Sequence, residues 1–202
     1  MNRSAGASTI PVGRRVFHLV AGSGTTLLAL AMPEPAYMTL VGGGALLSLA
    51  VDVGRQRAGF FNRVYLGIFR SILKPAEAAD ITGATYLLIA IFFAFYFFGM
   101  EVALPVLMFV AVGDPMAALI GPRCPGPRFW GKSPLGSLAF VAASMAVWAI
   151  LVAAGFGAWS WAVVITAVFA AAVEFAPFPL DDNLTVPLIA GGFMVAARAA
   201  GL

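Results

Sequence analysis

The chain has 202 residues, of which 61% are hydrophobic and only 10% are charged, and its formal net charge is +3. Soluble domains carry about 25% charged residues, so this composition excludes an ordinary soluble globule and indicates a polytopic membrane protein. The basic residues lie near the ends of apolar runs, which is a membrane-orientation signal, so nucleic acid is not expected as a partner. The single cysteine, Cys124, excludes an internal disulfide and a Cys/His metal cluster.

Long apolar runs fill most of the sequence, and a bilayer core takes about 20 apolar residues of helix. We expect an all-α fold in which residues 1–202 form a single membrane-embedded domain, a bundle of about seven transmembrane helices behind a disordered tail at 1–13. Gly191-Gly192 weakens the last run as a helix. The predicted spans are Val16–Met32, Tyr37–Val53, Thr82–Phe98, Val102–Ile120, Leu138–Ala154, Trp159–Val173 and Pro187–Ala200.

Arginine and lysine are distributed unevenly among the gaps between these runs. With the N-terminus in the cytoplasm, only Arg198 of the 12 basic residues falls on the outer side. This asymmetry is a strong positive-inside signal. A cleaved signal peptide over Arg14–Ala31 is the competing interpretation of the first run. The cytoplasmic segments are then 1–15, 54–81, 121–137 and 174–186.

The segment 54–81 is unusually polar for this chain. Arg57, Arg63, Arg70 and Lys74 alternate there with aromatic and aliphatic residues. The pattern is typical of an amphipathic helix lying on an anionic membrane surface. We therefore expect most of these cations to act as topology anchors on the cytoplasmic side.

Two pairs of ionisable residues mark the predicted cytoplasmic ends of the first two spans. Arg14 and His18 are four residues apart and share a helix face. His18 lies about one turn inside the membrane edge, where an ionisable group is either a functional candidate or a packing residue. Asp52 and Arg55 can pair at i, i+3, either as a helix-end ion pair or as part of a site.

Gly113-Asp114-Pro115 interrupts the fourth span. Asp114 lies roughly two turns from its cytoplasmic end, where a lone carboxylate is costly unless it faces a partner or a wet cavity. Asp before Pro also suits an N-cap followed by the first helical position, so we expect the helix to break and restart here and to line a binding site. A kinked helix with a protonated Asp114 is the alternative. Gly113, Ala117 and Gly121 form a ridge of small residues for close helix packing.

The stretch from Gly126 to Ser133 matches the Walker A pattern G-x-x-x-x-G-K-S. A P-loop NTPase is not indicated, because that motif follows a β-strand and here a membrane helix precedes it. Ser133 can still cap the next helix with Pro134 at its first position, which leaves free N–H groups for a phosphate. Lys132 supplies a point charge. The residues expected to leave room for a nucleotide beside them are Gly131, Gly136 and Ser137.

Oxygen ligands gather after the sixth span. Glu174, Asp181, Asp182 and Asn183 lie within ten residues in a chain that has nine acids. Such ligands suit Mg²⁺, which binds through one or two carboxylates plus substrate phosphates. The alternative is a solvated acidic loop with a helix cap at Asn183. Since this loop, Asp114 and the Gly-Lys-Ser loop fall on one side, they could converge into the parts that phosphoryl transfer requires.

Five short motifs, in order, resemble the CTP-dependent lipid kinases, a family that includes dolichol kinase, phytol kinase and yeast-type diacylglycerol kinase. This family is related to the cytidylyltransferases that make CDP-diacylglycerol. The resemblance runs from about residue 14 to residue 190. The motifs are Arg14-Arg15-x-x-His18-x-x-x-Gly22, Thr82-Gly83-Ala84-Thr85-Tyr86, Gly113-Asp114-Pro115-x-Ala117-Ala118-x-x-Gly121, Gly131-Lys132-Ser133-x-x-Gly136-Ser137 and Asp181-Asp182-Asn183-Leu184-x-Val186-Pro187.

The resemblance implies transfer of the γ-phosphate of CTP to the hydroxyl of a membrane lipid alcohol, with Mg²⁺ or another divalent cation as cofactor. The compact chain favours a polyprenol, a shorter prenol such as phytol or geranylgeraniol, or diacylglycerol over dolichol. We expect the CTP phosphates at Lys132 and Ser133, and Asp114 or Glu174 to orient or deprotonate the hydroxyl. Arg55 and His18 are expected to contact phosphate or cytidine. The expected metal ligands are Asp181, Asp182, Asp114 and Asn183.

Two other functions stay open at this stage. A membrane cytidylyltransferase would attack the α-phosphate and form a CDP-lipid, although the acidic C-terminal signature of those enzymes has no clear match. A small transporter or scaffold would place polar residues near mid-membrane in several spans, whereas these runs are nearly bare at their centres. Gly42-Gly43-Gly44 could support helix contacts within the chain or in a homodimer.

Overall fold

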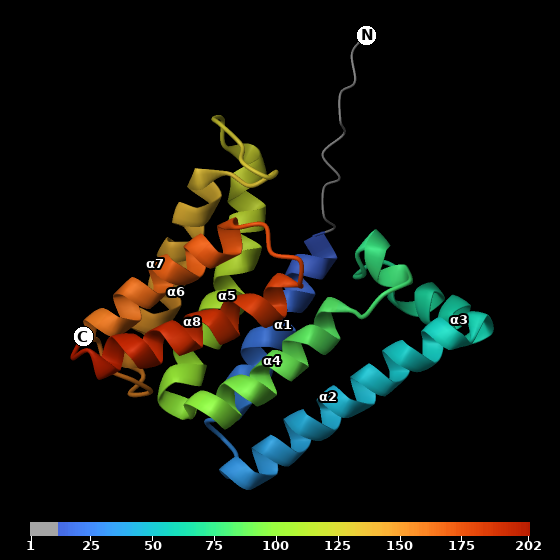
Figure 1. The fold of residues 1–202 in the computed structure, drawn as a ribbon, viewed down its shortest axis with the longest axis horizontal. Helices are drawn as coiled ribbons and strands as arrows, with labels where there is room; N and C mark the ends of the chain where they lie inside the picture. Colours follow the sequence, from blue (N-terminus) through green and yellow to red (C-terminus); the bar gives the residue numbers. More distant parts are fainter. Residues whose placement is uncertain (1–11) are drawn as a thin grey trace.

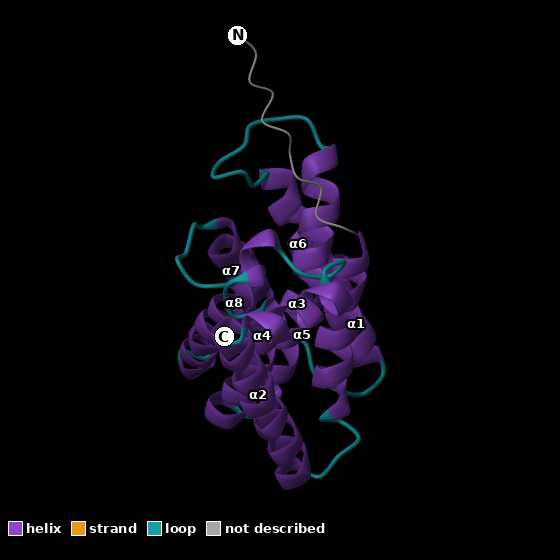
Figure 2. Ribbon diagram, turned by 90° about the vertical axis from the view of Figure 1, so that its right-hand side faces the viewer, coloured by secondary structure: helices purple, strands orange, loops and turns teal. Residues whose placement is uncertain are grey.

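The computed structural model describes residues 12–202, and within that range the secondary structure is helical, with one isolated β-bridge (Figure 2). The all-α prediction is therefore confirmed for this part of the chain. The expected tail at 1–13 lies outside the described residues, except that Val12 and Gly13 begin the first helix. The elements are α1 (Val12–Leu28), α2 (Glu34–Arg57), α3 (Gly59–Phe69), η1 (Pro75–Ala78), α4 (Gly83–Phe98), α5 (Met100–Ile120), η2 (Gly121–Arg123), α6 (Pro134–Ala153), α7 (Trp161–Phe175) and α8 (Asp182–Ala199).

Each predicted span corresponds to one helix, and α3 and η1 occupy the segment 54–81. Three helical stretches are long and apolar enough to cross a bilayer, namely Glu34–Arg57, Met100–Arg123 and Pro134–Ala153. Gly83–Phe98 and Trp161–Phe175 are apolar but shorter. Large apolar side chains such as Leu46 and Ile150 stay exposed on the outside of the bundle. An exposed apolar surface of this kind suits contact with lipid and is consistent with a membrane protein.

Side-chain caps explain where several of these helices begin. The hydroxyls of Thr82, Ser133 and Ser160 accept hydrogen bonds from backbone N–H groups three residues later. Such caps satisfy donors that the first turn of a helix leaves unpaired. Gly99, with φ of 69°, makes the tight turn between α4 and α5, a backbone conformation that favours glycine. The prediction that Ser133 caps the next helix with Pro134 behind it is confirmed.

Helix α5 runs unbroken through Pro105 and Pro115, so the expected break at Gly113-Asp114-Pro115 is wrong. Pro115 removes only its own N–H, which would have bonded the carbonyl of Ala111, and the packed surroundings hold the helix together across that gap. Ala111 is fully buried, in a stretch of α5 that is buried on almost every side. An apolar helix without a polar face takes the centre of a bundle.

The predicted small-residue ridge on α5 packs against α6. A side chain at Gly113 would overlap the ring of Phe140, and the Cα of Gly136 lies only 3.5 Å from the Cβ position of Gly121. Absent side chains on both helices thus allow close backbone approach. This contact fixes the start of α6, and with it Ser133, against the end of α5.

Helix α8 begins at Asp182, five residues earlier than the predicted span. Asp181 is its cap, since its carboxylate accepts a hydrogen bond from the Asn183 N–H at 3.0 Å, so a cap at Asn183 is wrong. Pro187 is the sixth residue of the helix, beyond its first turn, so its missing N–H removes the bond to the Asn183 carbonyl, yet the helix continues through it. Gly191 does not interrupt the helix because it lies under the ring of Phe98.

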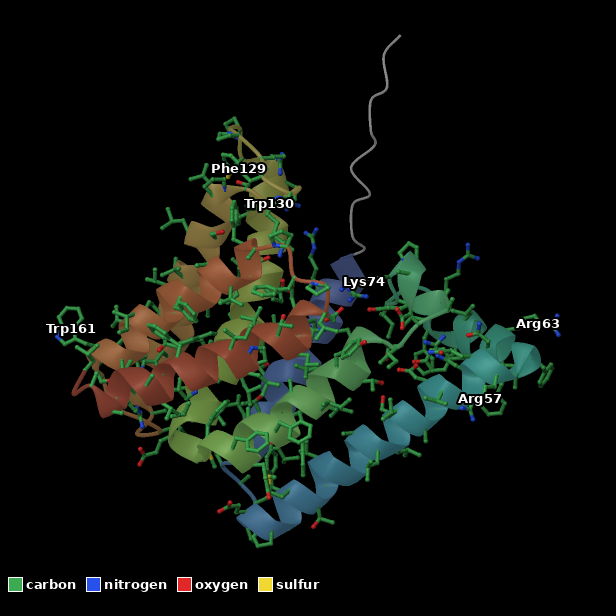
Figure 3. All side chains as sticks on the ribbon, viewed as in Figure 1. Arg57, Arg63, Lys74, Phe129, Trp130 and Trp161 are labelled. Carbon is green, nitrogen blue, oxygen red and sulfur yellow. The ribbon has the colours of Figure 1, made fainter. Side chains whose placement is uncertain are left out.

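The segments that were predicted to share one side of the membrane lie toward one end of the molecule. Figure 1 shows the start of α1, η1, the loop 121–133 and the loop 176–181 toward this end, while the turns at 29–33 and 154–160 lie toward the other. In Figure 3, Lys74 and Trp130 lie far from Trp161. The charged loops therefore meet at one end of an apolar bundle.

Candidate functional site

Lys132 forms the centre of a charged cluster assembled from three separate elements. Its ammonium lies 2.9 Å from Glu174 at the end of α7 and 3.0 Å from Asp182 at the start of α8. It also donates a hydrogen bond to the main-chain carbonyl of Glu174. The structure thus brings together residues that are separated by up to 50 positions in the sequence.

Asp114 stands behind this cluster, on α5. It is half-buried, and among residues 12–202 its carboxylate has neither an ion pair nor a hydrogen bond. Its charge is nevertheless close enough to raise the pKa of Asp182. Three acids and one lysine therefore share the cluster, so its carboxyl groups outnumber its cations by two.

Burial and charge act in opposite directions on this cluster. Burial lowers the pKa of Lys132, but the charges and hydrogen bonds of Glu174 and Asp182 outweigh it, so its pKa lies above the ordinary lysine value. Burial raises the pKa of Asp182, and the attraction of Lys132 does not fully offset this increase. Lys132 is accordingly a permanent cation, whereas the Asp182 carboxylate gains from any additional positive charge.

A cleft of about 390 Å³ opens beside Lys132. Lys74 also lines the cleft and pairs with Asp181 at 2.8 Å. The lining further includes Glu77, Asp80 and Asp182, so acids outnumber the two lysines, and a phosphate chain bound at the lysines would need an additional cation to balance the carboxylates. The sequence had suggested only an anchoring role for Lys74, and no local motif distinguishes it from the neighbouring arginines.

Aromatic rings form the outer part of the same cleft. Trp130 is 68% exposed, and its ring meets that of Phe175 edge to face, with centroids 6.0 Å apart. Trp130 also has φ of 51°, a conformation that non-glycine residues rarely adopt. The short hairpin that holds it is closed by two backbone hydrogen bonds between Phe129 and Lys132. This strained turn presents a large flat ring next to Lys132.

The Gly-Lys-Ser loop combines a turn, a cap and a helix contact. Gly131, with φ of 82°, permits the turn of the hairpin, and Ser133 caps α6. Gly136 serves mainly to pack α6 on α5, because an added Cβ would lie 3.2 Å from the Ala117 carbonyl. The Ser137 hydroxyl is buried and has no hydrogen-bond partner among the described residues. Of the set predicted to bind nucleotide here, Lys132 alone lines the cleft.

Two of the predicted metal ligands have other partners in the fold. Asp181 caps α8 and pairs with Lys74, while the Asn183 side-chain amide donates to the Gly83 carbonyl at 3.0 Å. Within residues 12–202, no group of three or more His, Cys, Asp or Glu side chains could hold a metal ion by itself. Glu174 and Asp182, which contact the same ammonium at 2.9 and 3.0 Å, are the oxygen donors that could share a divalent cation, with nucleotide phosphates completing its ligands.

Arg55 belongs to a second cluster and does not line the cleft. It is fully buried and bonds Asp52 at 2.8 Å, Asn62 at 3.0 Å and the main-chain carbonyl of Glu77 at 2.8 Å. The guanidinium of Arg55 also donates hydrogen bonds to the main-chain carbonyls of Ala78 and Asp80. With its donors so occupied, Arg55 positions η1 and the following turn, and contact with phosphate would require this cluster to open.

Glu77 and Gly83 form a junction between distant segments. Glu77 accepts two hydrogen bonds from Arg14, at 2.9 and 3.1 Å, and one from the Gly83 N–H at 3.0 Å. A Cβ at Gly83 would lie 2.8 Å from the Asn183 amide nitrogen. The cleft lies on one side of this junction, and a second cavity that contains His18 lies on the other. His18 is therefore separated from the cleft that Lys132 lines.

Comparisons of the chain with protein-family models, with curated proteins and with solved structures found no match. The arrangement of these side chains is therefore the basis on which a function can be inferred.

Proposed function

We propose that the protein is a membrane-embedded kinase that transfers the γ-phosphate of CTP to the hydroxyl of a lipid alcohol. The observation that carries the proposal is Lys132, held at 2.9 Å from Glu174 and 3.0 Å from Asp182 at the edge of a cleft. Phosphoryl transfer depends on positioning and on neutralising charge, which such a set of cations and carboxylates can supply.

The proposal includes a membrane arrangement in which all seven long helices cross the bilayer, the N-terminus is cytoplasmic and the cleft opens to the cytoplasm. The positive-inside asymmetry supports this orientation, because in the sequence Arg198 alone of the basic residues falls outside the predicted cytoplasmic segments. Helix α3 then lies along the membrane surface, with exposed Phe60 and Ile68 toward lipid and exposed Arg63 toward water.

The nucleotide would lie along the cleft with its phosphates between Lys74 and Lys132. Its base would stack on Trp130 and Phe175, since aromatic faces bind nucleobases with about 1–3 kcal/mol each. Phosphate oxygens would replace Glu174 and Asp182 as partners of Lys132. These two carboxylates would then be available to Mg²⁺ or a similar cation, which neutralises developing charge on the phosphates.

In the proposed reaction, Asp114 acts as the general base. The lipid hydroxyl oxygen forms a bond to the γ-phosphorus while the bond from that phosphorus to the bridging oxygen breaks, and CDP leaves with the bonding pair. Asp114 accepts the hydroxyl proton, because Glu174 is paired with Lys132 whereas Asp114 has no ion pair among the described residues. A carboxylate within reach of the hydroxyl is a suitable general base.

The test uses the purified full-length protein in lipid nanodiscs with CTP labelled in the γ-phosphate and a panel of prenols, polyprenols and diacylglycerol. We expect labelled lipid phosphate and CDP as products, and strong loss of both in Lys132→Ala and Asp114→Asn. Arg123→Ala is the matched control, because Arg123 is exposed in the same region and bonds only a main-chain carbonyl.

Phosphatidic acid, a lipid phosphate, is added to the panel to test the alternative: formation of a CDP-lipid from it with release of labelled pyrophosphate, and no transfer to any alcohol, would replace the kinase by a cytidylyltransferase. Absence of transfer to every alcohol, or full activity in Lys132→Ala, would refute the proposal.

A further inference from the structure

A second cavity, of about 210 Å³, lies between α1, α3, η1 and the start of α4. One part of its lining is apolar and is made of Phe17, Phe69 and Leu87, together with neighbouring aliphatic groups. The opposite part carries His18 and the Arg14–Glu77 ion pair. Phe17 and Phe69 are 43% and 37% exposed, so the apolar part reaches the surface of the bundle.

His18 has an unused hydrogen-bonding atom in this cavity. Its Nε2 is buried and has no partner among residues 12–202. Buried polar atoms are rarely left unsatisfied, and a role in binding is one explanation for such an atom when it lines a cavity. Arg14 does not serve as its partner, because the guanidinium of Arg14 bonds Glu77 and the Ile72 carbonyl.

The register between α1 and α5 places His18 near the reacting end of the molecule. The Cβ position of Gly22 lies 3.1 Å from the Cβ of Ala111, and the two helices run in opposite directions (Figure 1). His18 lies one turn before Gly22 in α1, and Asp114 and Pro115 lie one turn after Ala111 in α5. His18 and Asp114 therefore lie at about the same depth in the helical bundle.

We propose that this cavity binds the acceptor alcohol before transfer, with the hydroxyl donating a hydrogen bond to His18 Nε2 and the hydrocarbon chain leaving between Phe17 and Phe69. For transfer, the hydroxyl leaves His18 and moves toward the nucleotide, so that its proton can pass to Asp114. The choice of an alcohol as ligand rests on the proposed kinase function. Glu77 lines both cavities, so the lipid and the nucleotide approach its junction with Gly83 from opposite sides. A nucleotide would fit poorly here, because the single cation is already paired and the rest of the lining is largely apolar.

Photolabelling of the full-length protein in nanodiscs tests the site without requiring turnover. The probe is a long-chain primary alcohol with a diazirine near the hydroxyl, and its methyl ether is the matched probe that cannot donate a hydrogen bond. We expect the alcohol to label Phe17, Phe69 or Leu87 about fivefold more strongly than the ether, which corresponds to one net hydrogen bond.

Two variants sharpen the result. His18→Leu should remove the preference for the alcohol, and it breaks no hydrogen bond of Nε2 among the described residues. Ala84→Phe should fill the cavity and reduce labelling by both probes about tenfold. Its control, Ala142→Phe on an exposed face of α6, should be labelled as strongly as the wild type.

Labelling outside the cavity, or equal labelling by alcohol and ether in the wild type, would overturn this proposal even if CTP is consumed. Labelling as expected in a protein that phosphorylates no alcohol would support the lipid site and refute the kinase.

Discussion

Two charged clusters lie at the same end of this bundle, and they differ in how completely their groups are satisfied. Around Arg55 and Asp52, both side chains are at most 1% exposed and nearly every donor has a partner. Around Lys132, the side chains are up to 33% exposed and Asp114 has no partner among the described residues. The first cluster is closed, and the second is open to a cleft.

The difference indicates what each cluster does. A buried charge network that is fully hydrogen-bonded rigidifies the fold but has no capacity for a ligand. A network with excess carboxylate and solvent access can exchange its internal partners for phosphate and cation. The buried contacts of Arg55 indicate a positioning role, and we propose the binding role for Lys132, whereas the sequence predicts nucleotide contact for both.

Arg55→Ala is expected to have the largest effect, on stability. Removing one partner of a buried ion pair leaves Asp52 uncompensated and should reduce the free energy of unfolding by about 3–5 kcal/mol. Thermal unfolding in detergent, followed by circular dichroism, measures the change. Arg57→Ala, on the exposed side of the same turn, should differ from the wild type by less than about 0.5 kcal/mol. Equal melting temperatures for both variants would remove the distinction between the clusters.

Lys132→Ala should instead act on the reaction. Loss of the cation that meets the phosphates should reduce kcat by about 10²–10³-fold, the usual effect of removing one electrostatic contact in a transition state. The melting temperature should change much less than in Arg55→Ala, because the cluster is open to solvent. A variant that unfolds but keeps its specific activity per folded molecule would reverse our assignment.

Trp130→Ala should weaken nucleotide binding about tenfold, because it removes one stacking surface worth about 1–3 kcal/mol. Calorimetric titration with CTP in the absence of lipid measures the dissociation constant. Trp130→Phe should retain most of the affinity. Trp161→Ala, at the far end of the molecule in Figure 3, is the control, and an equal loss there would contradict a base-binding role for Trp130.

The raised pKa of Asp182 predicts a smaller, pH-dependent effect on stability. Protonation of Asp182 is favoured in the folded state, so its contribution to stability is greatest below the ordinary aspartate value and is lost as pH rises through the raised pKa. Wild type should therefore lose stability relative to Asp182→Asn over that range. Melting temperatures across a pH series, with and without Mg²⁺, test this, and Mg²⁺ should restore wild-type stability near neutral pH. Parallel curves for the two proteins would contradict it.

The helices were predictable because their signals are local. Apolar runs of sufficient length, with hydroxyl caps such as Ser133 and Thr82, mark where they lie. The pairing of Asp52 with Arg55 was also readable from their spacing of three residues. The break expected at Pro115 failed because packing around α5 outweighs the local effect of one missing donor.

The clusters themselves depended on contacts that no local pattern encodes. Lys74 reaches Asp181 across 107 positions, and Asn183 reaches Gly83 across 100. Glu77 is the one case with a usable signal, because Pro75 followed by an acid at the third helical position resembles a capping box, and its carboxylate accepts from the Lys74 N–H at 2.7 Å. Which acid meets which cation was decided by the way the helices pack.

Gly83 is where the two cavities become mechanically dependent on one another. The space above its α-carbon is bounded by groups from α1, η1 and α8, within 2.8 to 3.2 Å of where a methyl group would stand. A single added carbon would push these three segments outward together and would disturb both cavities at once. Gly83, which has no side chain, thus allows the two cavities to lie next to each other.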